Sequence, residues 1–67
     1  MTEMLLYRAY FLTESDHIRY VTGFKSTDDA DACAQADVML AQSEYAAIEI
    51  YQGWRLVRRR ERQPQAA

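Results

Sequence analysis

A single helix-forming segment lies between two pairs of strand-like segments, and this order limits the fold more than any other feature of the chain. Residues 30–43 are rich in alanine and contain no glycine or proline, which favours a helix. Side chains alternate between two faces over 4–12 and 17–24 before it, and over 45–51 and 54–57 after it. A period of two is typical of β-strands. The sequence therefore predicts the element order ββαββ.

The start of the expected helix is marked by hydroxyl and carboxylate side chains. Ser26 or Thr27 is the expected N-cap, because either side chain can accept a hydrogen bond from a free amide of the first turn. Asp28, Asp29 and Asp31 place negative charge near the positive end of the helix dipole. One arc of the helix is expected to face the core, and it collects Ala32, Cys33, Ala36, Met39, Leu40 and Ser43.

Each pair of predicted strands is joined by a short turn. Residues 13–16 form the first turn, and the second hairpin allows two registers. A two-residue turn would place Arg55 beside Ile50 on the core face. A three-residue loop over 51–53 keeps apolar residues together and sets opposite charges across the strands, so we prefer it. The three-residue loop pairs Ile50 with Trp54, Glu49 with Arg55, and Ile48 with Leu56.

A right-handed crossover from the second strand to the third is the common arrangement. It predicts an α+β fold with a four-stranded antiparallel sheet in the order 2-1-3-4. One helix then covers one face of the sheet, and the other face stays open. The strand residues expected on the core face are Leu5, Tyr7, Ala9, Phe11, Ile18, Tyr20, Phe24, Ile48, Ile50, Trp54 and Leu56.

The open face combines tyrosine, arginine and scattered aliphatic residues, a composition typical of partner surfaces. Its expected members are Leu6, Arg8, Tyr10, Leu12, Arg19, Val21, Ala47, Glu49, Tyr51, Arg55 and Val57. An ordinary solvated face is the alternative, since more than half of any protein surface is apolar. The residues that we predict to contact a partner are Arg8, Tyr10, Tyr51, Arg55 and Val57.

The length of 67 residues predicts one domain with a small core. Such a core rarely supplies more than roughly 3–5 kcal/mol without further support. Cys33 is the only cysteine, which excludes an internal disulfide, and it has no metal-ligand spacing to His17. Association is the remaining support. We therefore predict a protein–protein interaction module that forms a homodimer through the open face or an edge strand, with another protein as the alternative partner.

The balance of charge reverses near the end of the sequence. Residues 1–54 contain three Lys/Arg against nine Asp/Glu, whereas residues 55–67 contain five arginines against Glu61. Because residues beyond 58 are polar and include Pro64, we expect a ββαββ domain over 1–58 and a basic, flexible tail over 59–67.

Three roles are considered for the basic segment. It blunts an edge strand, it binds RNA or single-stranded nucleic acid beside the tyrosines, or it pairs with the acidic helix start of the same or a neighbouring copy. The expected nucleic-acid contacts are Arg58, Arg59, Arg60 and Arg62. A net charge of −2 makes nucleic-acid binding the alternative function rather than the leading one.

No pattern in the chain points to catalysis. Cys33 stands among alanines, which predicts a buried, inert thiol, and His17 follows a turn without catalytic partners. Trp54, next to a glycine turn, is expected to fill the core. We therefore predict a non-enzymatic protein with no cofactor and no metal. The lack of a long apolar run or a basic-apolar leader predicts a cytoplasmic protein with no membrane partner.

Several short motifs carry a resemblance. They are Tyr7-Arg8-Ala9-Tyr10-Phe11-Leu12, His17-Ile18, Asp28-Asp29 and Ile48-Glu49-Ile50-Tyr51-Gln52-Gly53-Trp54-Arg55-Leu56-Val57. In this order the chain resembles a group of short alphaproteobacterial proteins whose activity is uncharacterised. The resemblance implies a ββαββ order and a bacterial cytoplasmic setting. Ser15-Asp16 stands where the group has an aspartate-glycine turn, and the arginine tail extends past the final hairpin.

Overall fold

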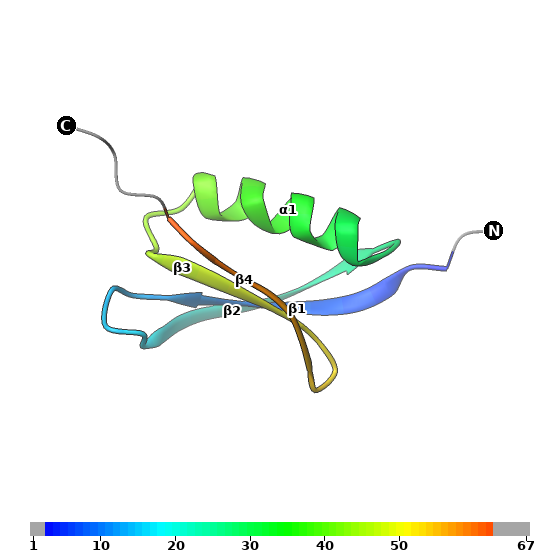
Figure 1. Ribbon diagram of the computed structural model, residues 1–67, viewed down its shortest axis with the longest axis horizontal. Coiled ribbons are helices and arrows are strands. Elements are labelled where there is room, and N and C mark those ends of the chain that lie inside the picture. The colour runs from blue at the N-terminus through cyan, green and yellow to red at the C-terminus, as the bar shows by residue number, and fades with distance from the viewer. Residues whose placement is uncertain (1–2, 63–67) are drawn as a thin grey trace.

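The computed structural model describes residues 3–62, and it confirms the ββαββ order (Figure 1). The elements are β1 (Leu5–Leu12), β2 (Ile18–Ser26), α1 (Asp29–Ala41), β3 (Ala47–Gln52) and β4 (Arg55–Glu61). All strand pairs are antiparallel, and the sheet order is β2-β1-β3-β4, as predicted. The helix covers one face of the sheet and leaves the other open (Figure 1).

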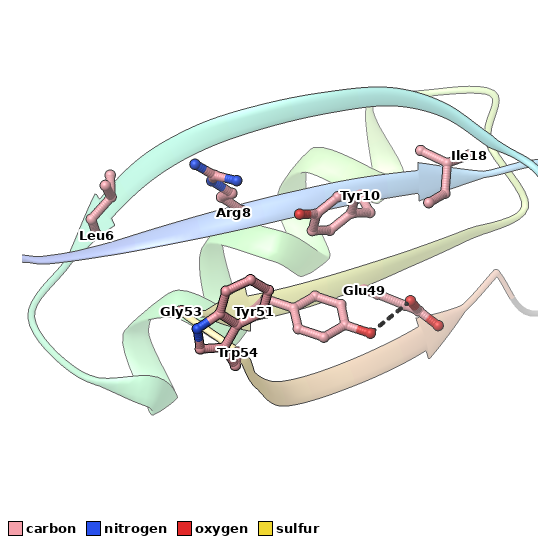
Figure 2. Close-up of a pocket in the computed structure, with 8 residues that line it drawn as sticks. All are labelled: Leu6, Arg8, Tyr10, Ile18, Glu49, Tyr51, Gly53 and Trp54. Atoms are coloured by element: carbon pink, nitrogen blue, oxygen red, sulfur yellow. Dashed lines mark hydrogen bonds between the residues drawn. The ribbon is translucent and has the colours of Figure 1, made fainter.

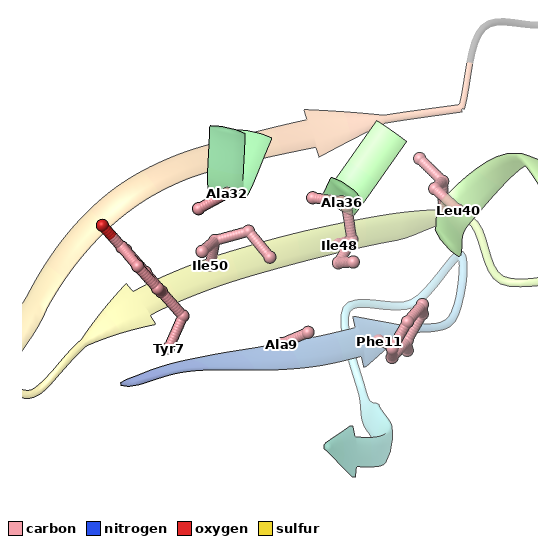
Figure 3. Packing of buried hydrophobic residues seen from close by; sticks show 8 residues of the cluster. All are labelled: Tyr7, Ala9, Phe11, Ala32, Ala36, Leu40, Ile48 and Ile50. Atoms are coloured by element: carbon pink, nitrogen blue, oxygen red, sulfur yellow. The ribbon is translucent and has the colours of Figure 1, made fainter. Parts of the chain in front are cut away.

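The core lies between α1 and the two central strands. Its buried cluster consists of Tyr7, Ala9, Phe11, Ala32, Ala36, Leu40, Ile48 and Ile50 (Figure 3). Three of these eight are alanines, whose small side chains let the helix lie close to β1 and β3. Few large side chains are therefore fully buried, and the core is thin. Leu12 and Ala47, which we expected on the open face, are also buried.

Asp28, rather than Ser26 or Thr27, is the N-cap of α1. Its carboxylate accepts a hydrogen bond from the backbone amide of Asp31 at 2.8 Å. The fully buried hydroxyl of Ser26 donates instead to the Asp31 carboxylate at 2.6 Å and contacts the Asp28 carbonyl at 3.1 Å. Ser26 thus joins the end of β2 to the first turn of the helix.

The first hairpin contains an irregularity that changes the face of one residue. Phe11 pairs with Tyr20, but Leu12 pairs with Ile18, so Arg19 is an extra residue in β2. An extra residue shifts the side chains beyond it to the opposite face of a sheet. The prediction that Ile18 lies on the core face is therefore wrong. Tyr20 keeps that face, with its ring centroid 5.6 Å from that of Phe11, but on the edge strand β2 it is more than half exposed.

The register of the second hairpin differs from the one that we preferred. Gln52 pairs with Arg55, so Gly53 and Trp54 form a two-residue turn, and Gly53 has a φ of 61°. Glycine at the first central position is what such a turn requires. Tyr51 pairs with Leu56 and Ile50 with Arg58, which makes Val57 an extra residue. Because the turn lies one residue later than the two-residue turn that we weighed, Arg55 pairs with Gln52 and does not lie beside Ile50.

The new register moves two apolar residues out of the core. Trp54 lies at the tip of the turn and is fully exposed, so its predicted role as a core residue is wrong. Leu56 is half-exposed, and it shares the open face with Tyr51 because directly opposed residues point to the same side.

β4 continues three residues past the predicted domain end. Arg59 and Arg60 belong to this strand, and Arg62 is held by the backbone carbonyls of Leu40 and Tyr45 at 2.5 and 2.9 Å. The prediction that the tail begins at 59 is therefore wrong for residues 59–62. The expected flexibility of 63–67 lies outside the described residues.

Candidate interaction surface

A groove crosses the sheet face opposite α1 (Figure 2). Its volume is about 630 Å³. We call it the open-face groove, and its lining residues are Leu6, Arg8, Tyr10, Ile18, Glu49, Tyr51, Gly53 and Trp54. Both central strands contribute to it, because residues 6, 8 and 10 of β1 alternate toward this face, as do residues 49 and 51 of β3.

Two cross-strand pairs form the middle of the open-face groove. Arg8 pairs with Tyr51, and Tyr10 pairs with Glu49. The two tyrosine rings meet edge to face, with centroids 5.3 Å apart and planes at 85°. The Tyr51 hydroxyl donates to a Glu49 carboxylate oxygen at 3.4 Å, and the negative charge of Glu49 raises the pKa of Tyr51 above its ordinary value. The phenol therefore stays neutral and acts as a hydrogen-bond donor.

The two ends of the open-face groove are apolar and exposed. Leu6 and Trp54 lie at one end, and Ile18 lies at the other (Figure 2). Their exposed fractions are 60% for Leu6, 101% for Trp54 and 56% for Ile18. Large apolar side chains in water are unfavourable, so this face is suited to be covered.

Three of the five predicted contact residues come together here, and two do not. Arg8, Tyr10 and Tyr51 line the open-face groove. Arg55 instead reaches the helix side, and Val57 packs against the core cluster. The position of the turn is the cause, because a turn over Gly53 and Trp54 sets Arg55 opposite Gln52, on the helix side, and reverses the faces that we predicted for Arg55 and Val57. No feature of the sequence distinguished this turn from the three-residue loop that we preferred.

Arg55 belongs to a hydrogen-bond network at the start of the helix, which links the exposed Arg55 to the buried Tyr7 through Asp29. Its guanidinium donates to both carboxylate oxygens of Asp29 at 3.0 Å, and Asp29 also accepts from the hydroxyl of the buried Tyr7 at 2.8 Å. Arg55 and Tyr7 hold the pKa of Asp29 below its ordinary value. Burial, followed by the bond to Asp29, raises the pKa of Tyr7 to about 12. The network ties β4 and β1 to α1.

Arg59 joins three acidic residues at the edge of the open face. Its guanidinium donates to Glu49 at 2.6 Å, to Asp16 at 2.7 Å and to Glu61 at 3.4 Å. The bonds to Asp16 and Glu49 raise the pKa of Arg59 above its ordinary value. The predicted pairing of Glu49 with Arg55 is therefore wrong, since Arg59 lies opposite Glu49.

The remaining arginines of the basic segment differ in their use. Arg60 lies 3.5 Å from Asp37 on the helix, and Arg62 donates to carbonyl oxygens at the helix end, including that of Ser43. Cations near a helix C-terminus are favourable because they oppose its dipole. Among residues 3–62, Arg58 has no hydrogen-bonding or ionic partner. Three of the four predicted nucleic-acid contacts thus bind groups of their own chain.

The groups considered for chemistry lie apart from one another. Cys33 is half-buried rather than fully buried, and His17 is exposed. Within the described part of the chain, no three His, Cys, Asp or Glu side chains form a group able to hold a metal ion. No helix in residues 3–62 has the length and apolar character to cross a membrane.

In comparisons with known proteins, no family model, curated protein or solved structure matches this chain.

Proposed function

We propose that this protein is a small non-enzymatic protein–protein interaction module that works as a homodimer through its open sheet face. The observation that carries the proposal is the open-face groove, in which Leu6, Ile18 and Trp54 are exposed around a centre of tyrosine and arginine. Exposed aromatic and arginine side chains beside aliphatic ones are typical of interface centres.

The thin core supplies the reason for association. Alanines fill much of the space under α1, so a single copy buries few large side chains. Covering an exposed Leu or Ile contributes up to roughly 1.5–3 kcal/mol per side chain, which is large beside the total stability of a small domain. A second copy of the chain is the simplest partner, because one symmetric contact buries these residues in both copies. The low net charge of −2 opposes such association only weakly.

An edge strand is the other route to a dimer, and the open face is the favoured one. At one edge, Arg59 and Arg60 of β4 are held in ion pairs with their own chain. At the other edge, β2 carries the exposed cations Arg19 and Lys25. Charged side chains along an edge discourage strand addition.

Light scattering coupled to size-exclusion chromatography tests the proposal. At high micromolar concentration we expect twice the chain mass of 7.8 kDa. Leu6→Ser is expected to shift the protein toward monomer. Val38→Ser is the matched control, because Val38 is about as exposed but lies on α1. A wild-type monomer at high concentration would contradict the proposal, and equal effects of both substitutions would contradict the assigned face.

The alternative function is binding of RNA or single-stranded nucleic acid to the same face and the Arg-rich end. It is supported by Tyr10 and Tyr51, whose rings lie on the central strands of an open sheet, where bases can stack. It is weakened by the internal pairing of Arg59, Arg60 and Arg62. The double variant Arg8→Ala with Arg58→Ala tests it without removing part of β4. Binding at low salt that weakens in this variant would favour nucleic acid over a second copy.

A further inference from the structure

The open face contains a row of four residues whose first member would fit its last, and whose second would fit its third, in a second copy of the same row. Gly23, Arg8, Tyr51 and Leu56 lie side by side across β2, β1, β3 and β4, because each is paired with the next. The row therefore begins with a residue that has no side chain and ends with a half-exposed leucine. Its two middle members are a cation and an aromatic ring.

We infer that two copies pack face to face about a twofold axis that runs along the strands between β1 and β3, with Leu56 of each copy seated on the partner's Gly23. This inference rests on the proposed homodimer. The axis places β2 over the partner's β4 and β1 over the partner's β3. The row of one copy then faces the same row of the partner in the opposite order. Each residue therefore faces a residue of different size or charge.

Gly23 is the first independent support. Only Gly53 among the glycines has a positive φ, so the backbone of β2 does not require glycine at 23. A Cβ atom there would lie 3.8 Å from the Tyr7 carbonyl oxygen and 3.9 Å from a Leu6 methyl, which is ordinary contact. Glycine inside a strand weakens it and often marks a place where another molecule approaches closely. The flat position fits the partner's Leu56.

The charges and aromatic rings of the open-face groove match in the same arrangement. Arg8, which has no hydrogen-bonding or ionic partner among the described residues, comes to lie over the ring of the partner's Tyr51. A cation over an aromatic face is attractive. In the next row, Tyr10 is placed opposite the partner's Glu49, where its hydroxyl can donate to the carboxylate. Arg8 of each copy thereby gains an aromatic neighbour, and Tyr10 gains an acidic one.

The apolar end of the open-face groove distinguishes this axis from its alternative. With the axis along the strands, Leu6 and Trp54 of both copies gather at one end (Figure 2). An axis across the strands would separate them and place Leu56 opposite the partner's Arg59, which is already bound to Glu49. The first arrangement brings the apolar side chains of the two copies together and does not set Leu56 against the ion pair of Arg59 with Glu49.

A size exchange between positions 23 and 56 tests the packing. Gly23→Val adds a side chain where the partner's Leu56 sits, and Leu56→Ala removes that leucine. Either variant alone is expected to weaken the dimer by about tenfold or more, because both contacts are lost. When the two variants are mixed, one contact is native and the other sets the added valine side chain against the shortened alanine side chain. Native mass spectrometry is therefore expected to show heterodimers well above the two homodimers.

Folding and association are separated by two controls. Circular dichroism is expected to show each variant folded as a monomer, since residue 23 has room for a Cβ and Leu56 is half-exposed. Thr22→Val, on the neighbouring residue of β2, is expected to leave the dimer unchanged. If the wild type is a dimer but the mixture gives no excess of heterodimer, this packing is wrong and the homodimer stands. If the wild type is a monomer, the proposed function itself fails.

Discussion

The guanidinium of Arg55 lies 3.0 Å from each carboxylate oxygen of Asp29, and this contact joins the first residue of β4 to the first turn of α1. The two residues are 26 positions apart in the sequence. The acidic helix start and the basic end of the chain, which stand apart as opposite charge blocks in the sequence, are therefore used against each other within one molecule.

Loss of this contact is expected to destabilise the fold. Arg55→Ala removes both hydrogen bonds and leaves Asp29 with only the Tyr7 hydroxyl as a side-chain donor among the described residues. We expect the melting temperature to fall. Arg58→Ala, which changes an exposed arginine of the same strand, is the control and is expected to melt like the wild type. Equal melting temperatures for the two variants would contradict a structural role for Arg55.

Asp29 is expected to make stability depend on pH in the acid range. Its pKa lies below the ordinary value of 3.8, because Arg55 and Tyr7 bind the charged form. The stability that it contributes is complete above the unfolded pKa and is lost as pH falls through the folded pKa. Asp29→Asn is therefore expected to be less stable than the wild type at about pH 6, with a smaller loss on acidification. Urea unfolding at a series of pH values measures this difference.

Tyr7 is expected to limit stability in the alkaline range. Folding raises its pKa from 10.0 to about 12, so the fold favours the protonated phenol. Its contribution is complete below the unfolded pKa of 10.0 and is lost as pH rises toward the folded pKa of about 12. In Tyr7→Phe this loss should be absent, although the variant starts from lower stability because Asp29 loses a donor. Parallel alkaline unfolding curves for the two proteins would contradict the assignment.

The helix cap supplies a prediction with a magnitude. Asp28→Ala removes the acceptor of the Asp31 amide and is expected to cost about 1 kcal/mol of unfolding free energy. Thr27→Ala is the matched control, because Thr27 is exposed and precedes the cap. Chemical denaturation measures both values. A larger loss of unfolding free energy for Thr27→Ala than for Asp28→Ala would contradict Asp28 as the N-cap and favour Thr27, one of the two residues expected from the sequence.

The sequence was sufficient for the order of elements and for the sheet topology. Alternation over β1 and β3 correctly predicts Tyr7, Ala9, Phe11, Ile48 and Ile50 as core residues. These strands are central and regular, so a period of two holds along their length.

The predictions fail at the two edge strands, because β2 contains a bulge and the turn before β4 lies at a different position from the one that we preferred. A register shift of one residue moves the side chains beyond it to the opposite face of the sheet. The extra residue Arg19 in β2 places Ile18 on the open face, and the turn over Gly53 and Trp54 sets Arg55 opposite Gln52, on the helix side. Bulges and turn positions depend on how the paired strands twist and pack, which residue types along one strand do not reveal. Trp54 was misplaced for the same reason, since the register decides whether it belongs to the strand or the turn.

The claim that a second copy covers the open face can be tested directly through Trp54. It is the only tryptophan of the chain and is fully exposed in one copy, so its fluorescence reports on this face alone. Emission and acrylamide quenching are measured from nanomolar to high micromolar concentration. We predict that emission shifts to shorter wavelength and quenching falls over the range in which light scattering shows the dimer forming. Trp54 that stays equally quenched at every concentration would contradict the account.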